Sequence, residues 1–188
     1  MNVTSLAIPE VKLITMRRIG DDRGFFSETF SARILADCGI DTTFVQDNHS
    51  MSRQVHTVRG LHLQIAPAAQ GKLVRVPRGR ILDIAVDVRR GSPTFGAHVA
   101  QELSADTWNA MYIPPGFAHG FCTLEPDTEV IYKVTAYYSP EHERGVLWHD
   151  AALGIDWPVS AGVAQTSAKD CRYLPLAQCP VYFEYEGK

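Results

Sequence analysis

The chain has 188 residues, of which 45% are hydrophobic and 21% are charged, and its formal net charge is -3 at pH 7. This length fits one domain of roughly 150 residues with short additions, and the composition is too apolar for a disordered chain. The small negative charge excludes a general affinity for nucleic acid, and no apolar run approaches the roughly 18 residues of a membrane-spanning helix.

The first predicted element is a short helix between Ser31 and Gly39. Ser31 is a good N-cap residue, and Gly39 is a typical helix stop. One face of this segment is apolar at helical spacing, formed by Phe30, Ile34, Leu35 and Cys38. No other segment before the tail predicts a helix.

Short β-rich runs separated by turn residues follow from residue 72 to residue 138. The runs are 72–76, 81–88, 98–103, 111–113, 120–124 and 129–138. Within 81–88, Asp83 and Asp87 share the face opposite the apolar residues, as a period of two requires. This spacing predicts an all-β domain, an antiparallel sandwich or barrel with a few short peripheral helices.

The rest of the chain predicts no second domain. Residues 153–188 contain several prolines and predict an irregular tail packed on the barrel, with at most a short helix after Lys169. The start of the sequence lacks a basic segment followed by an apolar one, and the four cysteines are widely spaced. We therefore expect a single domain over 1–188, in the reducing cytoplasm, without a signal peptide.

Two clusters of polar residues contain a histidine each. On a strand, Gly60, His62 and Gln64 point to one face, with Arg59 before them and Lys72 opening the next strand. The second histidine, His119, follows a Pro-Gly turn and stands between aromatic residues. Each histidine alone is also consistent with a hydrogen-bonded residue of a barrel core.

Together, the two clusters resemble the paired motifs of the cupin superfamily, Gly-x-x-x-x-x-His-x-His and Pro-x-Gly-x-x-His. Gln64 replaces the second histidine of the first motif, and no glutamate follows at ligand spacing. His62 and His119 are only two ligands, whereas a firm divalent site uses three or four. The sequence therefore predicts no metal site.

Further motifs lie outside these clusters, and each alone also fits a structural role. Arg23 is suited to bidentate phosphate binding, and Phe25 or Phe26 to covering a base or sugar. The remaining motifs are the polar segment 44–50, the strand with Tyr132, and the segment 167–170.

Taken in order, these motifs resemble the dTDP-4-dehydrorhamnose 3,5-epimerases, a metal-free branch of the cupins. The resemblance extends over nearly the whole chain and rests on the motifs Asp22–Phe26, Val45–Asn48, Arg59–His62, Gln70–Arg75, Gly91–Gly96, Pro115–Phe121, Tyr132–Lys133, Tyr137–Pro140, Ile155–Pro158 and Ser167–Asp170. It implies a cofactor-free epimerisation at carbons 3 and 5 of a dTDP-4-keto-6-deoxy sugar, in dTDP-L-rhamnose biosynthesis.

The resemblance also implies the roles of individual residues. His62 is the general base, paired with Asp170; Tyr132 is the general acid on the opposite face of the sugar; and Lys72 lies near the developing negative charge. Residues that match substrate-binding positions are Arg23, Phe26, Glu28, Gln46, Asn48, Arg59, Lys72, His119, Tyr138, Glu143 and Lys169. Stacking of Tyr138 on the thymine is our own expectation.

The same resemblance implies a homodimer. Family members are dimers in which N-terminal elements reach into the neighbouring subunit, so we expect segment 1–50 to be exchanged with the dimer partner. Arg23 and Glu28 would then complete the partner's site.

Three alternatives stay open. In the first, the enzyme acts at only one carbon, 3 or 5, or on a related dTDP-4-keto sugar of another deoxysugar pathway. In the second, it is a metal-dependent cupin that uses His62 and His119. In the third, it is a cupin that binds a sugar nucleotide without catalysis, in which case Tyr132 and Asp170 would have no need to accompany His62.

Overall fold

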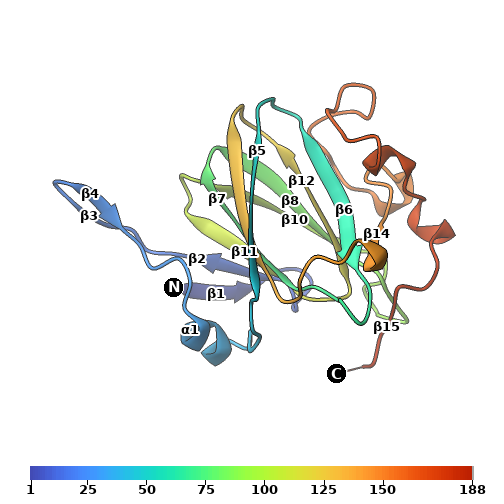
Figure 1. The fold of residues 1–188 in the computed structure, drawn as a ribbon, viewed down its shortest axis with the longest axis horizontal. Helices are drawn as coiled ribbons and strands as arrows, with labels where there is room; N and C mark the ends of the chain where they lie inside the picture. The colour runs from blue at the N-terminus through green and yellow to red at the C-terminus, as the bar shows by residue number, and fades with distance from the viewer. Residues whose placement is uncertain (188) are drawn as a thin grey trace.

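Two antiparallel β-sheets face each other in the computed structural model, which describes residues 1–187 (Figure 1). The first sheet has the strand order β1-β2-β11-β7-β13-β5 and the second the order β10-β8-β12-β6-β14. The strands of the first sheet are β1 (Asn2–Ser5), β2 (Lys12–Thr15), β5 (Gln46–Ser52), β7 (Lys72–Arg78), β11 (Asn109–Ile113) and β13 (Thr128–Val134). Those of the second are β6 (Val58–Gln64), β8 (Arg80–Asp87), β10 (His98–Ser104), β12 (Phe117–Thr123) and β14 (Glu143–Gly145).

Smaller elements surround the two sheets. They are the hairpin β3 (Ile19–Asp21) and β4 (Gly24–Phe26), the helix α1 (Ala32–Asp37), the parallel pair β9 (Arg89–Arg90) and β15 (Phe183–Glu184), and the 3-10 helices Pro140–His142, Ala151–Leu153, Asp170–Arg172 and Leu176–Gln178. The expected fold class, an all-β sandwich with short peripheral helices, is confirmed.

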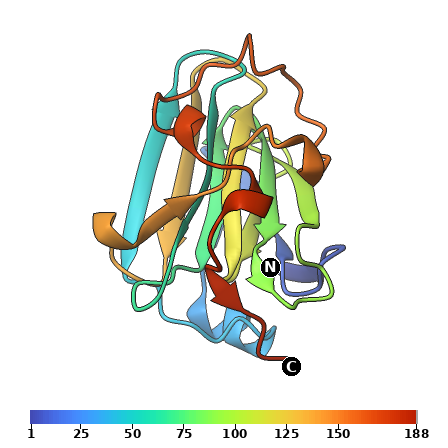
Figure 2. The same ribbon diagram turned by 90° about the vertical axis from the view of Figure 1, so that its right-hand side faces the viewer.

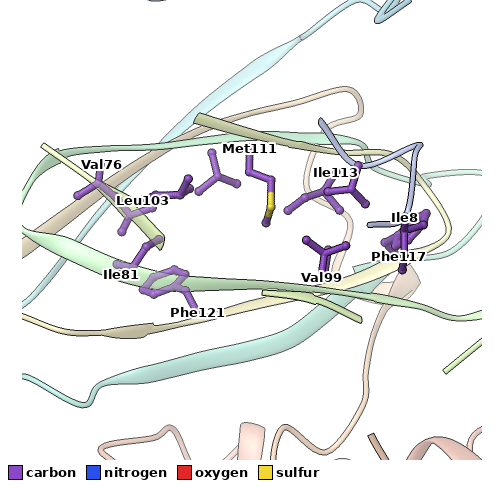
Figure 3. Packing of buried hydrophobic residues seen from close by; sticks show 13 residues of the cluster. Ile8, Val76, Ile81, Val99, Leu103, Met111, Ile113, Phe117 and Phe121 are labelled. Atoms are coloured by element: carbon purple, nitrogen blue, oxygen red, sulfur yellow. The ribbon is translucent and has the colours of Figure 1, made fainter. Parts of the chain in front are cut away.

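The space between the sheets is filled at one end by apolar side chains. Met111 and Ile113 of one sheet meet Ile81, Val99 and Phe121 of the other (Figure 3). These side chains point inward because alternate residues of a strand face opposite sides of a sheet. Their burial, at about 25 cal/mol per Å² of apolar surface, is the main force that holds the sheets together.

Each sheet also has an apolar outer face that another part of the chain covers. Leu61 and Ile84 on the second sheet pack against Trp148 and against Leu153 and Leu176 of the C-terminal tail. The tail crosses that sheet in Figure 2. The first sheet is covered on its outer face by α1, where Leu35 lies against residues of β2, β7 and β11. Both sheets are therefore buried on both faces over much of their area.

The helix and most strands lie where the sequence predicts them. The Ser31 side chain caps α1 by accepting a hydrogen bond from the Ile34 N–H. The predicted strand 129–138 is too long, because β13 ends at Val134. Beyond it, side-chain acceptors take over part of the bonding: Thr135 Oγ1 accepts from the Gly71 N–H, and Gln46 Oε1 accepts from the Tyr138 N–H, although the Thr135 N–H still donates to the Gly71 carbonyl.

Strands β6 and β12 approach closely at a pair of glycines. A Cβ on Gly60 would lie 2.5 Å from the Cα of Gly120, so no side chain fits there. This crossing places His62 directly opposite His119 in the strand pairing, with an irregularity in register just beyond. The two histidines therefore lie on neighbouring strands at the same level of the barrel.

The hairpin β3–β4 projects away from the two sheets (Figure 1). Its aromatic residues are largely exposed, with Phe25 at 53% and Phe26 at 69% relative exposure. Phe25 packs edge-on against Trp108, which anchors the base of the hairpin to the barrel. Across residues 1–187, no helix is long and apolar enough to cross a membrane.

Candidate active site

Two cavities, of about 430 and about 250 Å³, share three lining residues, His62, Lys72 and Tyr132. His62 comes from β6 of the second sheet, whereas Lys72 and Tyr132 come from β7 and β13 of the first. The shared residues therefore bring together polar groups from both sheets, at the part of the barrel that the apolar core leaves open.

His62 is paired with Asp170 of the C-terminal tail. His62 Nε2 lies 2.8 Å from Asp170 Oδ1, and the other carboxylate oxygen accepts a hydrogen bond from the Gly60 N–H at 3.2 Å. The Ser167 hydroxyl accepts from the Asp170 N–H and holds the start of this 3-10 turn. Both carboxylate oxygens are thus held by residues of β6, the strand that carries the histidine.

The charge of Asp170 follows from these contacts. Burial alone would raise the pKa of Asp170, but the hydrogen bonds from His62, Gly60 and Ser167 outweigh it and hold the pKa below its ordinary value. An ionised carboxylate only accepts hydrogen bonds, so Nε2 of His62 carries the proton and Nδ1 keeps its lone pair. This is the tautomer of a histidine prepared to accept a proton at Nδ1.

Tyr132 faces the cavities from the first sheet. Burial raises the pKa of its phenol, and Arg59 opposes this shift. The phenol is therefore protonated at neutral pH and is available as a proton donor. His62 and Tyr132 stand on opposing sheets, so a molecule held between them would meet one from each side.

Lys72 is a buried cation in the same space. Its ammonium donates a hydrogen bond to the His62 carbonyl at 3.2 Å. Burial lowers the pKa of Lys72 to about 8, while the nearby Asp83 and Glu143 oppose the shift. Near neutral pH the ammonium is mostly protonated, and it supplies a positive charge in a poorly solvated site.

His119 forms a second histidine–aspartate pair beside the first. Its Nε2 lies 2.7 Å from Asp83 Oδ1, and both side chains are almost fully buried. Burial lowers the pKa of His119, although Asp83 acts in the opposite direction. The period of two places Asp83 on the face opposite the apolar residues of its strand, but nothing in the sequence assigns it a partner.

The remaining wall of the larger cavity combines Arg59 with the tail. The Arg59 guanidinium donates to Ser52 Oγ and to the Met51 carbonyl. Residues 165–167, Lys169 and Asp170 of the tail close this side, and Phe121 adds an aromatic surface. The tail residues 165–167 and Phe121 were not predicted as site residues, since nothing in their spacing links them to the histidines.

The smaller cavity is lined by amides and by a charged group. Gln46 donates to Asn48 Oδ1 at 2.8 Å, and the Tyr138 hydroxyl donates to Glu143 Oε2 at 2.8 Å. Glu143 also pairs with Lys169 at 2.5 Å. Burial would raise the pKa of Glu143, but Lys169 and Tyr138 outweigh it and lower the pKa below its ordinary value.

Three predicted residues lie elsewhere in this chain. Arg23 and Phe26 belong to the exposed β3–β4 hairpin, Glu28 follows it, and none of the three lines either cavity. Arg23 instead pairs with Asp21 of its own hairpin at 2.5 Å.

Gln64 occupies the position of a cupin metal ligand but has another function in the fold. Its side-chain amide donates to the carbonyls of Ala68 and Tyr137 and accepts from the Ser139 N–H. These three bonds tie two loops to β6. Among residues 1–187, no group of three or more His, Cys, Asp or Glu side chains is arranged to hold a metal ion.

A His–Asp pair that faces a protonated tyrosine across a polar cavity is an arrangement suited to proton transfer. On this β-sandwich, it defines an isomerase of the cupin type. More particularly, the chain belongs to the dTDP-4-dehydrorhamnose 3,5-epimerase family, whose family model matches residues 5–178.

Individual proteins support this membership. The chain is 51% identical over 185 residues to a dTDP-4-dehydrorhamnose 3,5-epimerase of Sinorhizobium fredii, covering 98% of this chain and 94% of that one. It is also similar to the crystal structure of the Legionella pneumophila dTDP-6-deoxy-D-glucose-3,5-epimerase in complex with dTDP-4-keto-L-rhamnose. The two share 42% sequence identity and a TM-score of 0.94, and the match covers 99% of both chains. A 3′-monoepimerase from Streptomyces bikiniensis in complex with dTDP-quinovose is also similar, with 31% identity, a TM-score of 0.86, and coverage of 93% of this chain and 87% of that one.

Proposed function

We propose that this protein converts dTDP-4-dehydro-6-deoxy-D-glucose to dTDP-4-dehydro-L-rhamnose by inverting carbons 3 and 5, a step in dTDP-L-rhamnose biosynthesis. The observation that carries the proposal is the His62–Asp170 pair opposite Tyr132 in a cavity that Lys72 makes positive. Family membership over nearly the whole chain supplies the substrate class.

The first chemical step is removal of a proton beside the ketone. The 4-ketone acidifies the hydrogens on carbons 3 and 5, and Nδ1 of His62 accepts one of them, leaving an enolate. Asp170 stabilises the imidazolium that forms and keeps the ring in its tautomer, as an orienting acid does in a triad.

Inversion requires the proton to return from the other face of the sugar. Tyr132 stands on the opposing sheet and is protonated, so it donates to the carbon that His62 deprotonated. The His62 imidazolium then releases its proton to solvent and Tyr132 regains one from solvent, so that the same pair can act at the second carbon. The enolate oxygen needs positive charge while it exists, and Lys72 provides this charge in a buried position. This scheme uses no cofactor and no metal.

The nucleotide portion needs partners for a pyrophosphate and a base. Arg59 lines the larger cavity and is suited to the pyrophosphate, and His119 lines the same cavity. The smaller cavity is suited to the nucleoside, with Tyr138 stacking on the thymine. It is lined by Gln46, Asn48, Tyr138 and Glu143, and Lys169 pairs with Glu143.

We also propose a homodimer in which the β3–β4 hairpin, with Arg23 and Phe26, and the adjacent Glu28 complete the partner's site. The exposure of Phe26 and the projection of the hairpin from its own barrel support this arrangement. A complementation experiment tests it: Arg23→Ala and His62→Asn chains are mixed after dissociation. If Arg23 acts in the partner's site, mixed dimers contain one intact site and regain activity. Mixtures that stay inactive, or a monomer in analytical ultracentrifugation, would contradict the proposal.

A second candidate is epimerisation at a single carbon, which the similarity to a 3′-monoepimerase favours. Incubation with dTDP-4-keto-6-deoxyglucose in deuterium oxide separates the two. Deuterium at both carbons, with a rhamnose product trapped by a reductase, supports the 3,5-epimerase; deuterium at one carbon supports the second candidate. Binding without exchange would contradict both. We place the enzyme in the cytoplasm, which cell fractionation tests.

A further inference from the structure

Tyr173 is a part of the site that neither the sequence motifs nor the cavity walls identify. It follows the 3-10 helix Asp170–Arg172 directly, so one turn of the tail carries both the carboxylate and this ring. The Tyr173 ring meets the His62 imidazole edge-on, with ring centroids 5.8 Å apart and planes at 68°. His62 is therefore contacted by the tail at two places.

The position of this ring is fixed by a glycine on β14. Gly145 lies directly opposite His62 in the pairing of β14 with β6. A Cβ built on Gly145 would lie 2.4 Å from two atoms of the Tyr173 ring, so the ring occupies the space of the missing side chain. The ring thus packs on the backbone of β14 and is held beside His62.

The hydrogen bond to Asp170 leaves one motion of the imidazole unrestrained. A single bond at Nε2 fixes that nitrogen, but the ring can still tilt about it and move Nδ1 away from the sugar. A packed aromatic edge restricts such a tilt, and rings at this distance and angle attract each other. Burial raises the pKa of Tyr173, so the ring contacts His62 as a neutral phenol.

We propose that Tyr173 is a positioning residue for the general base: its ring, seated on Gly145, holds the His62 imidazole so that Nδ1 faces the substrate. The inference rests on the proposed function of His62. It assigns the role to the aromatic ring and not to the hydroxyl, since the contact with His62 is made by the ring.

Three variants of Tyr173 and one matched control test the inference. Tyr173→Phe keeps the ring, Tyr173→Leu keeps much of the volume, and Tyr173→Ala removes both. Tyr185→Ala removes another tyrosine of the tail, one that packs on Arg89 and lines neither cavity. Thermal unfolding first establishes which variants are folded.

The expected results distinguish a positioning role of Tyr173 toward His62 from a purely structural role in the fold. Tyr173→Phe and Tyr185→Ala keep the wild-type kcat within about twofold, whereas Tyr173→Leu and Tyr173→Ala lower kcat by about tenfold to hundredfold with little change in KM, since small misplacement of a reacting group has effects of this size. The acid limb of the kcat profile also moves in the Leu and Ala variants. A folded Tyr173→Leu protein with wild-type kcat and pH profile would overturn the inference, and so would a loss in Tyr173→Phe equal to that in Tyr173→Leu.

A measurement without substrate distinguishes failure of the positioning role of Tyr173 from failure of the proposed function of the enzyme. In protein with isotope-labelled histidine, NMR reports the tautomer and titration of His62 directly. Wild type and Tyr173→Phe should show a proton on Nε2 alone, and Tyr173→Leu a mixture of tautomers or a shifted titration. If wild type exchanges no hydrogen at carbons 3 and 5, the proposed function fails, while the NMR result still decides whether Tyr173 positions His62. Unchanged His62 signals in Tyr173→Leu would reject the positioning role.

Discussion

The two histidine–aspartate pairs of the barrel have the same geometry but different surroundings. The ring-to-carboxylate distances are 2.8 Å for His62–Asp170 and 2.7 Å for His119–Asp83, and the two histidines lie opposite each other on neighbouring strands. The His62 side chain is 29% exposed and His119 only 7%. Exposure of the side chain, more than hydrogen-bond geometry, distinguishes the proposed base from its neighbour.

The origin of the aspartate differs as well. Asp83 lies on the adjacent strand of the same sheet, so ordinary strand pairing brings it to His119. Asp170 comes from the tail, 108 residues away from His62 in sequence. One pair therefore belongs to the sheet itself, whereas the other is assembled by a segment that packs on the sheet.

The largest expected effect separates the two histidines. His62→Asn should lower kcat by about 10²- to 10⁴-fold, the typical contribution of a general base, while dTDP binding stays close to wild type. Deuterium exchange at carbons 3 and 5 and calorimetric titration with dTDP measure the two quantities. Near-native deuterium exchange in His62→Asn would show that His62 is not the general base.

The next effect separates the two aspartates. Asp170→Asn should lower kcat by up to about 10⁴-fold, because an amide no longer enforces the tautomer with a free Nδ1. Steady-state kinetics and the His62 tautomer by NMR check this expectation together. A variant that keeps both kcat and tautomer would show that the backbone alone orients His62.

A smaller effect concerns the pH range of activity. The Lys72 ammonium loses its proton as pH rises through its pKa of about 8, so kcat should fall above this pH. Asp83 raises the pKa of Lys72, and its replacement in Asp83→Asn should therefore move the alkaline limb to lower pH. Tyr185→Ala is the control, because Tyr185 is not among the groups that act on Lys72 and lines neither cavity. An alkaline limb that stays in place in Asp83→Asn would contradict this coupling.

The smallest effect is on stability in acid. The pKa of Asp170 is lowered in the folded protein from 3.8, so the stability it contributes is complete above that value and is lost as pH falls below it. Wild type should therefore lose more free energy of unfolding on acidification than Asp170→Asn does. Urea unfolding at neutral and acid pH measures the difference, and equal losses in both proteins would contradict it.

How far the sequence predicts the site depends on the kind of contact. The period of two on 58–64 places His62 and Gln64 on one face of their strand, and the same period places Asp83 on the face opposite the apolar residues of its strand, because local strand geometry decides these orientations. Which of the two faces points into the barrel follows from the pairing of the sheets and not from the period. The pairing of His62 with Asp170 followed only from the family resemblance. No periodicity in the sequence specifies which loop of an irregular tail meets which strand, and Tyr173 was missed for the same reason.

The end of β13 was mispredicted for a related physical reason. The apolar and aromatic run continues to Tyr138, but the side chains of Thr135 and Gln46 take hydrogen bonds that a strand neighbour would otherwise make. Such side-chain bonds depend on the tertiary structure and leave no pattern in the strand itself.

The distance in sequence between His62 and Asp170 has a consequence for biosynthesis of the enzyme. A ribosome that has made the whole barrel up to β14 has not yet supplied the carboxylate, so a nascent chain or a product truncated before residue 170 holds a histidine in an undefined tautomer. Catalytic competence would then arise only when the last fifth of the polypeptide docks. Activity would thus report on completion of the chain, and not on formation of the barrel alone.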